Sequence, residues 1–195
     1  MKIIFASQNQ GKVKEVKAIF NNSPFKIVSL YDLDNNIDIE ETGSTFKENA
    51  LLKAKTVYDH YKHPTIADDS GLMIEQLDGR PGVISARYAG KNCTFEDNNL
   101  KVVKELSDLP EPHRAKFVST AIFYDNGNII ESVGELHGVI IKVQRGKAGF
   151  GYDPIFIPDG YEQTISEMEF ELKNKISHRA KSFEKLKELL VKKYC

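Results

Sequence analysis

The sequence of 195 residues contains no tryptophan, only two cysteines and no apolar run of the length that a membrane span requires. Cys93 and Cys195 are isolated and lack the spacing of a metal site or a disulfide framework, which favours a reducing, cytoplasmic setting. The apolar stretch at the N-terminus ends after Ala6 and is too short for the core of a signal peptide. We therefore expect a protein that is neither secreted nor bound to a membrane.

An excess of charge of one sign is also missing, because 27 Lys and Arg residues face 28 Asp and Glu residues. A surface for nucleic acid or for an anionic membrane would show a basic excess, so we expect neither partner. The hydrophobic content of 41% is enough for a proper core, and no low-complexity segment interrupts the chain. We expect a single domain over residues 1–195.

Hydrophobic periodicity predicts alternating helices and strands, followed by an antiparallel section. Helical spacing covers residues 11–20, 46–61, 95–106 and 177–194. Strand-like segments cover residues 3–6, 26–30, 65–67, 72–77, 115–124, 129–133 and 138–143. Thr45 and Thr94 are expected to cap their helices, and Asn126-Gly127 is a strong hairpin signal. This order of elements predicts an α/β fold with a mixed sheet.

Two acidic pairs give the strongest functional signal. Asp68-Asp69 directly follow a short apolar strand, and Glu40-Glu41 lie upstream. Acids are depleted in strands and cost free energy when crowded or desolvated, so something positive should compensate them. Mg²⁺ is the candidate, since it takes oxygen ligands, whereas no Cys/His cluster indicates zinc. The alternatives are that Glu41 is solvated and that Asp68 caps a turn.

The segment Ser7-Gln8-Asn9-Gln10-Gly11-Lys12 joins the first strand to the first helix. Backbone N–H groups at a helix N-terminus face anions well, and Lys12 adds a point charge. The segment is not a P-loop, because Ala6 and Val13 stand at positions that the motif reserves for glycine and Ser/Thr. An ordinary capped turn with a solvated lysine is the alternative interpretation.

Three other segments carry weaker signals. Ser70 is not a nucleophile of the G-x-S-x-G type, because Asp68 stands at the first glycine position. The glycine-rich stretch 146–151 leads into aromatic residues that offer flat faces to a base, although a hairpin with core aromatics is the alternative. At the start of the last helix, Ser177 is expected to cap, and His178 and Arg179 to protrude as hydrogen-bond donors.

Taken together, these segments resemble the inosine-triphosphatase-like family of pyrophosphatases, which act on non-standard purine nucleoside triphosphates. The match runs over nearly the whole chain with its motifs in the same order. The motifs are Ser7-x-Asn9-x-Gly11-Lys12, Glu40-Glu41-Thr42-Gly43-x-Thr45-Phe46-x-Glu48-Asn49-Ala50, Ala67-Asp68-Asp69-Ser70-Gly71-Leu72, Pro81-Gly82-Val83-x-Ser85-Ala86-Arg87-Tyr88, Gly149-Phe150-Gly151-Tyr152-Asp153-Pro154-Ile155-Phe156 and Ile176-Ser177-His178-Arg179. Two departures are small: Ser7 replaces the usual Thr, and Ala148 replaces one of two glycines.

The resemblance implies an elongated mixed β-sheet flanked by helices, in two lobes with a nucleotide in the cleft between them. It also implies a Mg²⁺-dependent homodimer that converts ITP, dITP and XTP to monophosphates plus pyrophosphate. Glu40 and Asp69 match the family's metal ligands, and Asp69 also matches the general base. The matching substrate contacts are Ser7, Gln8, Asn9, Gln10, Gly11, Lys12, Ser70, Phe150, Gly151, Tyr152, Asp153, Lys173, His178 and Arg179.

Two other interpretations remain open at this point. One is a pyrophosphatase of the related Maf type, which acts on modified pyrimidine or other nucleotides. The other is a regulator that binds nucleotides without turning them over. The acids near a triphosphate would repel it in the absence of a metal, so tight metal-free binding would favour the regulator.

Overall fold

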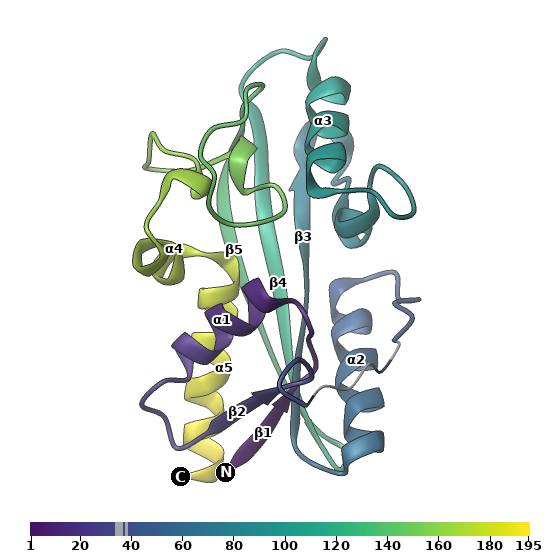
Figure 1. Cartoon of the computed structure of the whole chain (residues 1–195), viewed down its shortest axis with the longest axis vertical. Helices are drawn as coiled ribbons and strands as arrows, with labels where there is room; N and C mark the ends of the chain where they lie inside the picture. Colours follow the sequence, from purple (N-terminus) through teal and green to yellow (C-terminus); the bar gives the residue numbers. More distant parts are fainter. Residues whose placement is uncertain (34–36, 38) are drawn as a thin grey trace. The chain divides into compact units, whose positions relative to one another are not determined.

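The computed structural model describes residues 1–33, 37 and 39–195 and has a mixed α/β fold (Figure 1). Six strands form one sheet in the order β2-β1-β3-β4-β5-β6. β1 pairs in parallel with β2 and β3, whereas β5 pairs antiparallel with β6, so the predicted mixed sheet is confirmed. The strands are β1 (Lys2–Phe5), β2 (Lys26–Ser29), β3 (Thr65–Ile74), β4 (His113–Asp125), β5 (Asn128–Ile140) and β6 (Phe156–Pro158).

The predicted helices are present, and Thr45 and Thr94 cap two of them as expected. Thr45 forms a capping box with Glu48, and Thr94 forms one with Asp97. No helix in the described part of the chain has both the length and the apolar character to cross a membrane. The α-helices are α1 (Gln10–Ile19), α2 (Phe46–Tyr61), α3 (Phe95–Leu106), α4 (Phe170–Ile176) and α5 (His178–Tyr194), and the 3₁₀ helices are η1 (Glu75–Leu77), η2 (Gly82–Arg87), η3 (Asp153–Ile155) and η4 (Ile165–Glu167).

The described chain divides into two compact units that interleave along the sequence. Unit 1 comprises Met1–Asp69, Ser119–Gly134 and His178–Cys195. Unit 2 comprises Ser70–Val118 and Glu135–Ser177. The strands β3, β4 and β5 each contribute residues to both units. A single domain over residues 1–195 stays a prediction.

Unit 1 has apolar layers on both faces of its sheet, and strand alternation assigns residues to them. α1 and α5 cover one face, where Phe5 packs edge-on against Phe183 with ring centroids 5.7 Å apart. α2 covers the other face, where Ala50 and Ala54 pack with Ile4. Consecutive residues of a strand in this unit therefore point toward different helices.

Unit 2 has a core of its own, built on β-strand residues and α3. Leu72 and Ile74 of β3 pack with Val102 and Leu106 of α3 in this cluster. Phe117 and Phe156 also belong to the core of unit 2, with ring centroids 4.7 Å apart.

Two strands are longer than the sequence pattern predicts. β3 continues without a break from Thr65–Ile74, where two strands were expected on either side of the acids, and residues 75–77 form η1 instead of strand. β5 is also one strand, where the sequence pattern predicted two. Its glycines do not break the strand, but allow the backbone of other segments to approach it closely. A Cβ on Gly134 would lie 2.2 Å from the carbonyl oxygen of His178, and one on Gly138 would lie 2.2 Å from that of Ile157.

The predicted turn between β4 and β5 is confirmed. Asn126 and Gly127 both have positive φ, at 45° and 86°. This backbone matches a two-residue turn whose twist suits a hairpin of neighbouring strands.

Candidate active site

Asp68 and Asp69 are consecutive residues of β3, and their side chains lie on opposite faces of the sheet. Alternation places Asp68 on the side of Ile66, which packs with α1 and α5. It places Asp69 on the side of Ala67, which packs with α2. Each acid is therefore compensated separately, and the compensating charges are side-chain cations of the chain itself.

Asp68 is the centre of a buried series of ion pairs between α1 and α5. Its Oδ2 accepts hydrogen bonds from Lys12 Nζ at 3.0 Å and from Arg179 Nε at 3.2 Å. Arg179 Nη1 in turn donates to Glu15 Oε2 at 2.6 Å. Arg179, Asp68 and Glu15 are each only 2% exposed. Two acids alternate with two cations here, so the buried charges are paired within the fold.

The prediction that His178 and Arg179 protrude as donors is wrong. The two residues are 7% and 2% exposed. α5 begins at His178, directly after Ser177 as expected, but its first turn is buried in unit 1. The guanidinium of Arg179 consequently lies against Asp68 and Glu15.

Asp69 is held by two residues of α2. Lys53 Nζ donates to Asp69 Oδ1 at 3.1 Å and also to Glu41 Oε1 at 2.9 Å. Asn49 Nδ2 donates to Asp69 Oδ2 at 3.1 Å, while Asn49 Oδ1 accepts from the N–H of Gly43 at 2.7 Å. A Cβ on Gly43 would lie 2.6 Å from Asn49 Oδ1, so glycine is required for this approach. These contacts fix the acidic segment against the carboxylate of Asp69.

The pKa values of the two neighbouring acids move in opposite directions. Burial raises the pKa of Asp69, and the nearby carboxylate of Glu41 raises it further. Burial also acts to raise the pKa of Asp68, but the charges of Lys12 and Arg179 outweigh it and lower the pKa. Asp68 is thus a permanent counter-ion, and Asp69 is the stronger base of the two.

The two lysines of the site differ in the same way. Burial acts to lower the pKa of Lys53, but the charges of Asp69 and Glu41 prevail and raise it, so Lys53 stays cationic. Burial lowers the pKa of Lys12, although Asp68 opposes the change. An anionic ligand close to Lys12 would favour its protonated form.

The N-terminus of α1 has caps and also retains donors for an anion. Asn9 is the N-cap and accepts from the N–H of Lys12 at 3.1 Å, and Ser7 Oγ accepts from the N–H of Asn9 at 3.2 Å. The interpretation as a capped turn is therefore right, but the lysine is not solvated. The N–H groups of Gln10 and Gly11 donate to no acceptor within the described ranges. Gln8 is exposed beside them.

A glycine-rich loop in unit 2 holds a second group of predicted residues. Asp153 Oδ2 accepts from the N–H of Phe150 at 2.9 Å and from Lys173 Nζ at 2.8 Å. Lys173 Nζ also lies 4.6 Å from the centroid of the Phe150 ring. Gly149 has a φ of +84°, and a Cβ there would lie 2.2 Å from Asp153 Oδ2. The carboxylate of Asp153 therefore holds the loop through the backbone of Phe150 and the side chain of Lys173.

The two aromatic residues of this loop have different environments. Tyr152 is 4% exposed, donates from its hydroxyl to the carbonyl of Ser85 at 2.8 Å, and has a pKa raised by burial. The core interpretation is thus right for Tyr152. Phe150 is half-buried, with Phe95 of α3 at a centroid distance of 6.3 Å.

The carboxylates of Glu40, Glu41 and Asp69 supply oxygen atoms of the chemical type that magnesium binds. Glu40 is exposed, Glu41 is half-buried, and Mg²⁺ commonly binds one or two carboxylates and completes its shell with water and phosphate oxygens. Among the residues that the structure describes, no group of three or more His, Cys, Asp and Glu side chains could hold a metal. Because Lys53 holds one oxygen of Asp69 and one of Glu41, a metal would have to share or replace those contacts. Glu40 and Asp69 as ligands stay a prediction.

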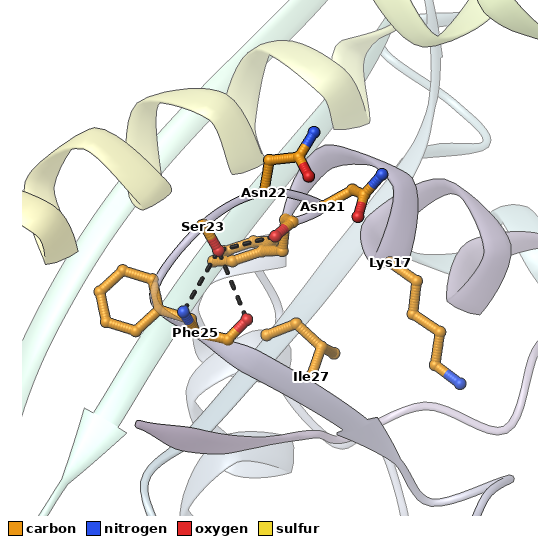
Figure 2. Close-up of a pocket in the computed structure, with 7 residues that line it drawn as sticks. Lys17, Asn21, Asn22, Ser23, Phe25 and Ile27 are labelled. Atoms are coloured by element: carbon orange, nitrogen blue, oxygen red, sulfur yellow. Dashed lines mark hydrogen bonds between the residues drawn. The ribbon is translucent and has the colours of Figure 1, made fainter.

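The remaining predicted contact, Ser70, is half-buried in β3 directly after Asp69. A separate cavity of about 250 Å³ lies beside the loop that follows α1 (Figure 2). There, Ser23 Oγ donates to the carbonyl of Phe20 at 2.7 Å. In the described part of the chain, none of the predicted site residues lines this cavity, so it is distinct from the candidate site.

Three residues of the site were not predicted. Asn49 and Lys53 lie one turn apart on α2 within its apolar stripe, and Glu15 lies between buried apolar positions of α1. A polar or charged residue on the buried face of a helix is the signal that could have identified them, because such a group needs a partner. The identity of that partner depends on contacts far along the chain.

The chain is similar over almost its whole length to known proteins. The family model described as the Ham1 family matches residues 3–189. A dITP/XTP pyrophosphatase of Thermoanaerobacter pseudethanolicus is 45% identical over 196 residues, which cover 99% of this chain and 98% of the relative. A dITP/XTP pyrophosphatase of Oceanobacillus iheyensis is also 45% identical, over 97% of this chain and 98% of the relative. The solved structure of a HAM1 protein from Coxiella burnetii matches with a TM-score of 0.90 and 37% identity, and covers 98% of this chain and 99% of its own.

Proposed function

The chain belongs to the Ham1 family, and from this premise we propose that it is a pyrophosphatase that converts ITP, dITP and XTP to the monophosphate and pyrophosphate. The observation that carries the chemistry is that the two neighbouring acids have different partners. Lys53 and Asn49 hold Asp69, whose pKa is raised by burial. Lys12 and Arg179 hold Asp68, whose pKa is lowered by their charges. The substrate class is supported by relatives that are themselves named dITP/XTP pyrophosphatases.

The N-terminus of α1 is the proposed site for the phosphates. The N–H groups of Gln10 and Gly11 and the ammonium of Lys12 supply positive potential at one end of a helix. Asp68 keeps Lys12 in place at 3.0 Å and is itself held by Arg179. Arg179 therefore contributes to phosphate binding through Asp68, and its guanidinium is already engaged with two carboxylates.

Asp69 is the proposed general base. Water attacks phosphorus at the α–β phosphate linkage, the bond to the departing phosphate oxygen breaks, and Asp69 accepts the proton that the water loses. A raised pKa strengthens Asp69 as a base near neutral pH. Lys53 and Asn49 orient both of its carboxylate oxygens.

Mg²⁺ is the proposed cofactor, with Glu40 and Asp69 as its ligands on the protein. When bound, the ion would neutralise phosphate charge and polarise the phosphoryl oxygens. Hard oxygen ligands without a Cys/His cluster favour Mg²⁺ over zinc. Activity should be lost in excess EDTA, return on addition of Mg²⁺, and survive a zinc-selective chelator. Full activity in EDTA would contradict the cofactor.

The glycine-rich loop of unit 2 is the proposed site of base recognition. Phe150 presents a half-buried ring whose position is fixed by Lys173 and by the bond from its N–H to Asp153. Hypoxanthine and xanthine carry a 6-oxo acceptor where adenine carries a 6-amino donor. A site that offers donors rejects ATP, because mismatched buried groups would lose their hydrogen bonds.

The test is a nucleotide panel in which phosphate and pyrophosphate release are measured separately. ITP, dITP or XTP should exceed ATP in kcat/KM by at least about a hundredfold, with pyrophosphate as the product. Comparable turnover of ATP and ITP would contradict the substrate class. Preference for a modified pyrimidine nucleotide would favour the Maf-type activity, and metal-free binding without turnover would favour a regulator.

A homodimer and a cytoplasmic location are also proposed. Sedimentation of the purified chain should give twice the mass of 22.1 kDa. Both cysteines, Cys93 and Cys195, are free, as suits a reducing compartment, and fractionation of the native cell should place the activity in the cytoplasm.

A further inference from the structure

Two consecutive residues of α3, Asn98 and Asn99, are each 2% exposed, and their side chains hold different carbonyls. Asn98 Nδ2 donates to the carbonyl of Ala86 at 3.2 Å. Asn99 Nδ2 donates to the carbonyl of Gly151, in the glycine-rich loop, also at 3.2 Å. The two bonds are alike in length and burial and differ in the segment that they fix.

Asn99 is poorly explained by stability alone. Its Oδ1 is buried and has no hydrogen-bond partner in the described part of the chain, whereas Asn98 Oδ1 accepts from the N–H of Ala89 at 2.7 Å. A buried amide that makes only part of its hydrogen bonds gives little or no net stabilisation, and an apolar residue would avoid the cost. What Asn99 does achieve is a fixed position for Gly151.

α3 presents one face to the loop. Phe95 and Asn99 are four residues apart on that face, where Phe95 packs near Phe150 and Asn99 holds the next residue, Gly151. Gly151 needs this support because it has a φ of +64°, and the space that a Cβ would fill there is open. Within the described residues, therefore, no group packs at the position of that Cβ.

Fixing the carbonyl of Gly151 also fixes the N–H of Tyr152, since both belong to one planar peptide group. That N–H is a donor of the kind that a 6-oxo purine accepts from. The hydroxyl of Tyr152 is anchored at Ser85, so the far end of the residue is immobile as well. Two side-chain contacts therefore restrain Gly151 and Tyr152, and the one from Asn99 acts directly on the peptide between them.

We propose that Asn99 is a positioning residue for base recognition, which holds the peptide between Gly151 and Tyr152 so that the loop prefers 6-oxo purines over adenine. The proposal rests on the proposed function and goes beyond it, because it assigns substrate preference to a residue outside the loop. Hydrolysis itself depends on the residues around Asp69. Loss of the Asn99 bond should therefore alter KM and preference far more than kcat.

The experiment compares Asn99→Asp with Asn98→Asp, because both changes conserve size and remove one donor to a carbonyl. Asn99→Asp should raise KM for ITP about five- to tenfold, as the loss of one hydrogen bond allows, and lower the ITP-to-ATP ratio of kcat/KM by a similar factor. Its kcat for ITP should stay within about twofold. Asn98→Asp should leave KM and the ratio unchanged, whatever its effect on Tm.

A second variant, Asn99→Ala, removes the donor and the unpartnered Oδ1 without adding charge. It tests the same proposal if Asn99→Asp does not fold. The proposal would be overturned if KM for ITP and the ITP-to-ATP ratio of kcat/KM were unchanged in the Asn99 variants. It would also be overturned if Asn98→Asp lowered that ratio as much as Asn99→Asp does. Either result would leave the proposed pyrophosphatase activity intact. A wild-type enzyme that does not prefer ITP to ATP would overturn the proposed function itself, and this proposal with it.

Discussion

Lys53 donates to Asp69 Oδ1 at 3.1 Å while it also holds Glu41 Oε1 at 2.9 Å. One buried ammonium thus joins the proposed general base to the acidic segment before α2. Burial and Glu41 raise the pKa of Asp69, and the charge of Lys53 opposes that rise. Lys53 therefore limits the rise in the pKa of the proposed base and favours the ionised form of Asp69.

Replacement of Lys53 by Met should shift the pH dependence of the enzyme. Without the cation, the pKa of Asp69 rises further, so Asp69 is protonated over a wider range of acidic pH. The acidic limb of the kcat/KM profile for ITP should move to higher pH than in the wild type. Lys55→Met is the control, because Lys55 is exposed on the same helix. A limb that stays in place or moves to lower pH would contradict the pairing.

Asp69→Asn should abolish turnover and largely preserve nucleotide binding. Asn keeps the size of the side chain but accepts no proton at neutral pH, so kcat should fall by at least about a hundredfold. Binding of a non-hydrolysable ITP analogue, measured by calorimetry, should change little. Near-normal kcat in this variant would assign the base elsewhere, and Asp68 would not be the next choice, because its pKa is lowered.

Local signals predicted the fold well where one short segment determines the structure. The capping boxes at Thr45 and Thr94 and the turn at Asn126-Gly127 all depend on residues within three positions of one another. The continuity of β3 was not predicted, because two adjacent acids argue against a strand unless their partners are known. Those partners come from distant segments of the chain, as with Arg179, which is 111 residues from Asp68.

The same limit applies to the candidate site. The types of residue and their motifs identified Lys12 and Asp69, since both lie in recognisable patterns. Alternation along a continuous strand determines which face of the sheet each acid occupies. Because the sequence pattern predicted a break in β3 at the two acids, this alternation could not be applied to them. The sequence consequently indicated the chemistry of the site. It predicted Arg179 as a protruding hydrogen-bond donor, whereas the structure buries Arg179 and pairs it with Glu15.

Arg179→Met should destabilise the fold strongly. It leaves the carboxylate of Glu15 without its 2.6 Å partner and weakens the compensation of Asp68, both in a buried setting. Breaking a buried ion pair by removing one partner costs about 3–5 kcal/mol, measurable by urea unfolding at pH 7. The double variant Glu15→Gln, Arg179→Met should recover part of the loss, because the buried negative charge of Glu15 is removed together with its cationic partner. A loss below about 1 kcal/mol in the single variant would mean that Arg179 is exposed in solution.

Lys12→Ala should weaken binding of triphosphates more than binding of monophosphates. Lys12 follows the donors of Gln10 and Gly11 at the start of α1, where its ammonium adds charge for the distal phosphates. KM for ITP should rise at least about tenfold, while the inhibition constant of IMP should change by less than about threefold. Lys14→Ala is the control, because Lys14 is exposed on the same helix. Equal weakening of ITP and IMP would place Lys12 near the α-phosphate or the base, and no change in either would mean that Lys12 serves only to neutralise Asp68.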